Sequence, residues 1–78
     1  MTTTQTTYRL RFVADGTTTD LYFRRTGRTS YGTIAWHLTQ LGNCAYTPTE
    51  WRTRGAAERV AHEVANDLHT FVVEEVTA

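Results

Sequence analysis

The sequence predicts an α+β fold, in which a small antiparallel sheet of three or four strands carries one main amphipathic helix packed on one face. Residues 8–14 and 20–25 alternate in polarity around Asp15-Gly16, the strongest short-range signal for a β-hairpin. Residues 57–68 instead repeat apolar side chains at i, i+3, i+4 and i+7, which is the spacing of a helix that lies on a sheet. The two periodicities together predict both layers of the domain.

The chain of 78 residues is long enough for one domain and too short for a separate catalytic domain. We expect a flexible, threonine-rich lead-in at residues 1–7 and a single α+β domain at residues 8–78. Cys44 is the one cysteine, so no internal disulfide can form. The sequence also has no signal peptide and no membrane span, and these features predict a cytoplasmic protein without a membrane partner.

The predicted hairpin has a register that satisfies both faces of the sheet. A two-residue turn at Asp15-Gly16 places five apolar side chains on the core face: Tyr8, Leu10, Phe12, Leu21 and Phe23. On the other face, the same register places Arg11 opposite Asp20 as an ion pair. It also places Arg9 opposite Tyr22, as a cation over an aromatic ring. A slip of one residue would bury the arginines and expose the aromatic side chains.

The segment at residues 33–41 has two interpretations. Ile34, Trp36 and Leu38 alternate as in a strand, and the threonine, isoleucine and tryptophan of this segment favour strands. The apolar residues of the same segment also fit helical spacing, with Gly42 placed to end a helix. We favour a third strand.

The second half of the chain predicts the main helix and a closing strand. Thr47-Pro48-Thr49-Glu50 has the form of a capping box and predicts one short helical turn. Trp51 does not share a face with the later apolar residues, so the main helix starts afresh, with Thr53 as its cap. It is expected to run from about Arg54 to Leu68. Phe71-Val72-Val73 then has the composition of a final strand.

The expected core combines apolar side chains from every one of these elements. Its members lie on the inner face of the strands and on the apolar stripe of the helix. They are Tyr8, Leu10, Phe12, Leu21, Phe23, Ile34, Trp36, Ala57, Val60, Ala61, Val64, Leu68, Phe71 and Val73.

One pattern covers most of the chain. The hairpin is followed by a segment that bears Trp36, then by Trp51-Arg52-Thr53-Arg54-Gly55-Ala56-Ala57-Glu58-Arg59-Val60-Ala61, and finally by Phe71-Val72-Val73-Glu74-Glu75-Val76. This pattern resembles small orphan proteins encoded by actinobacteria and their phages. The resemblance implies a compact sheet with one helix, and it assigns no activity and no functional residue.

No group of residues has the spacing of a catalytic or metal site. His62 and His69 lie seven residues apart, but zinc needs three or four ligands. Neither His37 nor Cys44 has a spacing relation to them, and no glycine-rich elbow or helix start activates the thiol. Glu74-Glu75 lies at a strand end without a surrounding cleft. We therefore expect no enzyme, no metal and no cofactor.

The arginines form the one feature that suggests binding, although the net charge is zero. Residues 1–54 carry seven arginines against three acidic residues, and residues 55–78 carry one arginine against five. The candidate binding residues lie on the uncovered sheet face and in a loop expected at residues 26–32: Arg9, Arg11, Tyr22, Arg24 and Arg28. Such a face can stack bases and neutralise phosphates. The alternative, which we favour, is that the closing strand pairs with residues 8–14 and brings Glu74 or Glu75 beside the arginines.

We therefore expect a small non-catalytic protein-binding or regulatory module, and the resemblance described above implies that it is phage-encoded. Its partner is another protein or a second copy of the chain, because the edges of a small sheet invite pairing. The other function considered is a nucleic-acid-binding domain that uses the arginine and tyrosine face. Zero net charge gives no long-range attraction to a polyanion, and this favours the protein-binding prediction.

Overall fold

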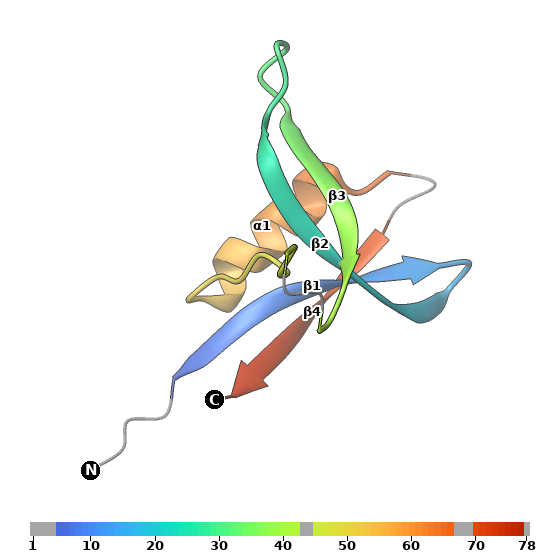
Figure 1. Cartoon of the computed structure of the whole chain (residues 1–78), viewed down its shortest axis with the longest axis vertical. Coiled ribbons are helices and arrows are strands. Elements are labelled where there is room, and N and C mark those ends of the chain that lie inside the picture. The colour runs from blue at the N-terminus through green and yellow to red at the C-terminus, as the bar shows by residue number, and fades with distance from the viewer. Residues whose placement is uncertain (1–4, 43–44, 67–69, 78) are drawn as a thin grey trace.

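The fold is a four-stranded antiparallel sheet with one helix, seen in a computed structural model that describes residues 5–42, 45–66 and 70–77. The elements are β1 (Thr6–Ala14), β2 (Thr17–Arg28), β3 (Ile34–Gln40), α1 (Arg54–Val64) and β4 (Thr70–Thr77). The strand order is β3-β2-β1-β4, and α1 packs on β1 and β4 (Figure 1). The predicted α+β class is confirmed, and β3 confirms the strand interpretation of residues 33–41.

The hairpin register agrees with the prediction at the turn and departs from it further along. Asp15 and Gly16 have φ values of 51° and 75°, as a type I′ turn requires, and Ala14 pairs with Thr17. Beyond the turn, β2 carries two extra residues, so Arg11 lies opposite Tyr22 and not opposite Asp20. Because the offset is an even number of residues, each side chain keeps its predicted face.

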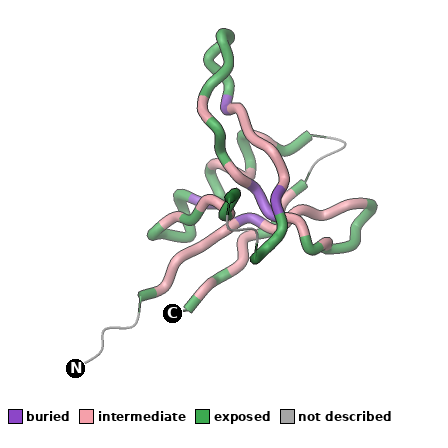
Figure 2. Tube along the Cα trace, viewed as in Figure 1, coloured by how far each residue is buried: buried purple, intermediate pink, exposed green. Residues whose placement is uncertain are grey.

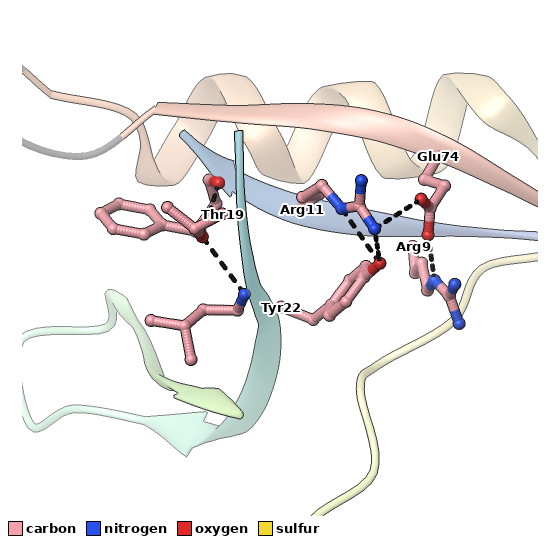
Figure 3. Close-up of polar contacts among 7 residues, drawn as sticks. Arg9, Arg11, Thr19, Tyr22 and Glu74 are labelled. Carbon is pink, nitrogen blue, oxygen red and sulfur yellow. Dashed lines mark hydrogen bonds and ion pairs between the residues drawn. The ribbon is translucent and has the colours of Figure 1, made fainter. Parts of the chain in front are cut away.

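The side chain of Thr19 satisfies the backbone at this bulge. Its hydroxyl donates to the carbonyl of Phe12 at 2.9 Å and accepts from the N–H of Leu21 at 3.2 Å (Figure 3). These two backbone groups would otherwise lack the ladder partners that an undistorted strand provides. A threonine at this position therefore allows the irregular register, because its hydroxyl pairs both polar backbone groups.

Past the bulge, β1 and β2 diverge, and the segment before α1 fills the gap between them (Figure 1). Trp51 exchanges two backbone hydrogen bonds of 2.8 Å with Tyr8 on β1. Thr49 donates its N–H to the carbonyl of Phe23 on β2, and its hydroxyl accepts from the N–H of Arg25. The helical turn predicted at Thr47-Pro48-Thr49-Glu50 is therefore wrong: this segment is extended, with Thr49 bonded to β2 and the Glu50 carboxylate accepting from the Thr7 hydroxyl on β1.

β2 extends further than predicted, to Arg28, so the first part of the loop expected at residues 26–32 is strand. One extra residue bulges between Arg25 and Gly27, and the ladder with β3 resumes beyond it. Gly27 has a φ of 153°, a conformation that residues with side chains rarely adopt. Glycine at this position suits a bulge as well as a loop, which is why the sequence did not distinguish them.

The helix begins where the sequence predicts and ends earlier. The hydroxyl of Thr53 accepts a 3.2 Å hydrogen bond from the N–H of Ala56, so Thr53 is the N-cap. The helix ends at Val64, because the backbone turns to an extended conformation at Ala65 on its way to β4. Leu68 lies outside the described residues.

The core lies between the sheet and α1 and centres on Phe23, whose ring is fully buried. The rings of Trp36, Trp51 and Phe71 surround it at centroid distances of 5.7 to 5.8 Å. Buried stretches gather where the strands cross (Figure 2). The cluster comprises Leu10, Phe23, Ile34 and Ala57, with Tyr8, Trp36, Trp51, Val60, Ala61, Val64, Phe71 and Val73 packed around them.

The core differs from the predicted one at three residues: Phe12 and Leu21 are not part of it, and Trp51 is. Phe12 and Leu21 are partly buried but lie outside the core cluster, although the rings of Phe12 and Phe71 are 5.7 Å apart. Trp51 joins the core because its backbone pairs with β1, which turns its ring towards Phe23. The sequence analysis placed Trp51 outside the core because it compared Trp51 with the apolar face of a helix, whereas Trp51 lies in an extended segment.

Replacing Leu10 with alanine should lower the free energy of unfolding by about 2 to 5 kcal/mol, because a fully buried side chain leaves a cavity. Chemical denaturation followed by circular dichroism measures this change. Val72→Ala is the control, since Val72 is 43% exposed on the neighbouring strand, and it should change stability by less than about 0.5 kcal/mol. Equal stability of Leu10→Ala and the parent would contradict the assigned core.

Thr19→Val should cost about 1 to 3 kcal/mol, because valine keeps the shape of the side chain but leaves the Phe12 carbonyl and the Leu21 N–H without their partner. Thr18→Val, at the exposed neighbouring position, is the matched control and should be nearly neutral. Urea denaturation of the two variants compares them directly. An equal effect of both substitutions would show that the bulge does not depend on the Thr19 hydroxyl.

Candidate binding surface

The pairing of β4 with β1 places Glu74 beside the arginines of β1. Arg9 lies opposite Glu74, and its Nε donates to Glu74 Oε2 at 2.5 Å. Arg11 Nη2 lies 3.3 Å from Glu74 Oε1, so one carboxylate serves two guanidinium groups (Figure 3). The ion pairs expected with the closing strand are confirmed for Glu74. Glu75 instead pairs with Arg54, at 3.6 Å.

Tyr22 was expected on an uncovered face, and it is buried, with 1% of its surface exposed. The guanidinium groups of Arg9 and Arg11 lie over its ring at 4.5 and 5.2 Å from the centroid. Its hydroxyl accepts hydrogen bonds from Arg11 Nε and Nη2 at 3.0 and 2.5 Å (Figure 3). The bulge in β2 causes this burial, because it moves Tyr22 opposite Arg11. The ring is therefore not available to stack on a base.

The electrostatics of this group favour the charged forms. Partial burial raises the pKa of Glu74. Hydrogen bonds from Arg9 and Tyr22 and the charges of Arg9 and Arg11 lower it, and together they outweigh the effect of burial, so the pKa lies below its ordinary value. The Tyr22 hydroxyl raises the pKa of Arg11. The cluster of Arg9, Arg11, Tyr22 and Glu74, here called the arginine cluster, thus carries one net positive charge.

Arg24 and Arg28 lie apart from the arginine cluster. Arg24 Nη1 donates to the carbonyl of Thr47 at 2.7 Å, and the guanidinium lies 5.6 Å from the ring centroid of Tyr46. Arg28 Nη1 donates to the carbonyl of Gly32 at 2.8 Å, near the turn between β2 and β3. The five candidate residues therefore belong to three places on the molecule, and only Arg9, Arg11 and Tyr22 are brought together.

The segment containing Tyr46 covers part of the face that was expected to be open. The Thr39 hydroxyl, which is buried on this face, donates to the carbonyl of Tyr46 at 2.6 Å. The ring of His37 meets that of Tyr46 edge to face at 5.4 Å. A single contact between a loop and the preceding strand leaves no periodic signal in the sequence, so the covering segment was not predicted.

A shallow hollow of about 350 Å³ adjoins the arginine cluster. Its lining combines polar and charged side chains with one apolar one: Arg11, Asp20, Tyr22, Gln40 and Leu41. No serine, cysteine, lysine or histidine belongs to the described residues that form this lining.

No family model, curated protein or solved structure matches the chain. The resemblance to small orphan proteins of actinobacteria and their phages therefore stays a prediction. The function has to be argued from the geometry of the molecule itself.

The described part of the chain also holds no group of three histidine, cysteine, aspartate or glutamate side chains placed to bind a metal ion. Cys44 and His69, which the sequence analysis considered as metal ligands, lie outside the described residues. Within residues 5–42, 45–66 and 70–77, no helix has the length and apolar character needed to cross a membrane.

Replacing Glu74 with glutamine should cost about 1 kcal/mol at neutral pH, because the pair is partly exposed and solvent screens it. Since folding lowers the pKa of Glu74 from the ordinary 4.5, its charge stabilises the fold at neutral pH. That stabilisation is lost as the pH falls below 4.5. The difference between parent and variant should therefore shrink in acid, which denaturation measured from neutral pH to pH values below 4.5 tests.

Glu75→Gln is the control for this experiment. It removes the same charge from the adjacent residue, whose pair with Arg54 is half-exposed on both sides. The expected cost is a few tenths of a kcal/mol, about the usual value for surface pairs. Equal losses in both variants would indicate a general charge effect and not the arginine cluster.

Proposed function

We propose that the chain is a small, non-catalytic protein-binding or regulatory module, and that it binds by adding a strand to the outer edge of β4. The observation that supports this proposal is the position of β4 at the end of the strand order β3-β2-β1-β4. The strand has eight residues and no proline. An edge of this length presents backbone donors and acceptors that another strand can satisfy.

The direction of the backbone groups on β4 follows from its pairing. The N–H and C=O of Tyr8 bond to Trp51, so those of the next residue, Arg9, face β4. Glu74, opposite Arg9, faces inward in the same way. Its alternating neighbours Val73 and Glu75 then direct their backbone groups outward, where no other described residue bonds to them.

We propose a second copy of the chain as the occupant of this edge. An antiparallel pair of β4 strands centred on Val73 places Val72 opposite Glu74 of the second copy, and no carboxylate opposite another. Registers centred on Glu74 or Glu75 place like charges directly opposite each other, which is destabilising. The favoured pairing joins two sheets about a twofold axis, the commonest symmetry of soluble dimers.

The nucleic-acid alternative on the sheet face has less support. The ring of Tyr22 is covered, and Arg9 and Arg11 share the charge of Glu74. A phage-encoded origin is part of the proposal only through the sequence resemblance. A cytoplasmic location is also part of it, because a lone cysteine suits a reducing compartment.

Glu75→Pro should abolish dimerisation and leave the fold intact. Proline removes the outward N–H of Glu75 and preserves the inward hydrogen bonds of its neighbours, as is usual for proline on edge strands. Light scattering coupled to size-exclusion chromatography measures the mass, and circular dichroism checks the fold.

The matched control is Glu75→Ala, which removes the same carboxylate and its pair with Arg54 but keeps the backbone N–H. It should remain dimeric. A parent protein that stays monomeric up to millimolar concentration would refute the self-pairing, as would a dimer that Glu75→Pro leaves unchanged.

A further inference from the structure

The hairpin of β2 and β3 forms an arm that projects from the rest of the molecule. The arm comprises residues 24–37 and makes up the upper end of the molecule in Figure 1. It contributes to the elongated shape, whose longest dimension is 45 Å against 29 and 26 Å. One face of the arm turns Ile34 and Trp36 towards the core, whereas residues 28–33 at its end are all exposed (Figure 2).

The arm concentrates positive charge in a protein whose net charge is zero. Residues 21–49 contain Arg24, Arg25 and Arg28 and no aspartate or glutamate. Residues 1–20 are balanced, and residues 50–78 carry three arginines against six acidic residues. Because salt screens charges beyond roughly 8 to 10 Å, the charges close to the arm, and not the net charge of the chain, determine the field there.

The side-chain hydrogen bonds that hold Arg24 and Arg28 use neutral acceptors. Arg24 and Arg28 donate to the backbone carbonyls of Thr47 and Gly32, which are neutral. No ion pair among the described residues involves either of them or Arg25. This distinguishes the arm from the arginine cluster, where Glu74 is shared by Arg9 and Arg11.

The tip of the arm is a turn fixed by its own hydrogen bonds. The N–H of Thr29 donates to the carbonyl of Thr33 at 2.8 Å, and the N–H of Gly32 donates to the carbonyl of Thr29 at 3.0 Å. The two threonine hydroxyls lie 2.6 Å apart. Tyr31 stands on this turn with 92% of its surface exposed. An aromatic ring on an ordered turn loses little entropy when it binds.

We propose that the arm enters the major groove of duplex DNA, with Arg24, Arg25 and Arg28 at the phosphates and Tyr31 at the base edges. The major groove, about 12 Å wide, admits a two-stranded β-ribbon. Arginines along the ribbon supply the phosphate contacts that position it. β3 and β4 are opposite edges of the sheet, so self-pairing through β4 leaves the arm free. This site is independent of the protein-binding function proposed above.

The test is fluorescence anisotropy of a labelled mixed-sequence DNA duplex, titrated with protein at several salt concentrations. Three phosphate contacts predict a log-log salt slope of about −2.7 for the parent. Arg25→Gln/Arg28→Gln should reduce the magnitude of the slope by about 1.8 and weaken binding more than about tenfold at low salt. Tyr31→Ser should weaken binding without changing the slope. Melting curves confirm that each variant is folded.

Arg52→Gln/Arg59→Gln is the matched control, since it removes two exposed arginines outside the arm and changes the net charge equally. It should leave the slope unchanged and the affinity within about twofold, because neither residue contributes a phosphate contact. No binding at low salt would overturn the proposal, and so would equal losses in the two double variants. Arm-dependent binding of polyglutamate with an affinity equal to that for DNA would overturn it too, in favour of an acidic protein surface.

Discussion

The two extra residues that β2 carries between Thr18 and Tyr22 determine most of the architecture. They separate β1 from β2 beyond the bulge, and this opens the gap that Thr49 and Trp51 occupy. Beyond Arg25, where the contacts with Thr49 end, the β2 ladder continues with β3, and this hairpin forms the arm. The Thr19 hydroxyl makes the distortion tolerable, because it supplies both hydrogen bonds that the bulge removes from the backbone.

The same offset converts a basic face into a closed cluster. With Tyr22 opposite Arg11, the arginine side chains lie over the ring, and their apolar stems shield it while the charged ends reach Glu74. The sheet thereby buries one aromatic ring on the side away from α1. In a domain this small, α1 covers only a limited apolar area, so burial of the Tyr22 ring on the opposite face increases the apolar surface removed from water.

The features of the fold that depend on local periodicity and turn chemistry could be predicted from the sequence. Asp15-Gly16, the alternation along β1 and the Thr53 cap were all sufficient to place their elements, and the faces survived because the bulge shifts the register by an even number. The bulge itself, the insertion of Trp51 and the cover provided by Tyr46 depend on individual hydrogen bonds between elements, which leave no periodic pattern in the sequence. The capping-box pattern failed because the Glu50 carboxylate bonds to Thr7 on β1 and Thr49 bonds to β2.

Net charge proved a poor guide to electrostatics because folding separates the charges in space. Glu74 neutralises arginines that are near it only after β4 has paired with β1. No carboxylate of residues 5–42, 45–66 and 70–77 pairs with the arginines of the arm, although the chain as a whole is balanced. A twofold pairing through β4 would place the two arms at opposite ends of a continuous sheet, since β3 forms the far edge of each copy. Dimerisation would then double the number of basic arms without bringing their charges together.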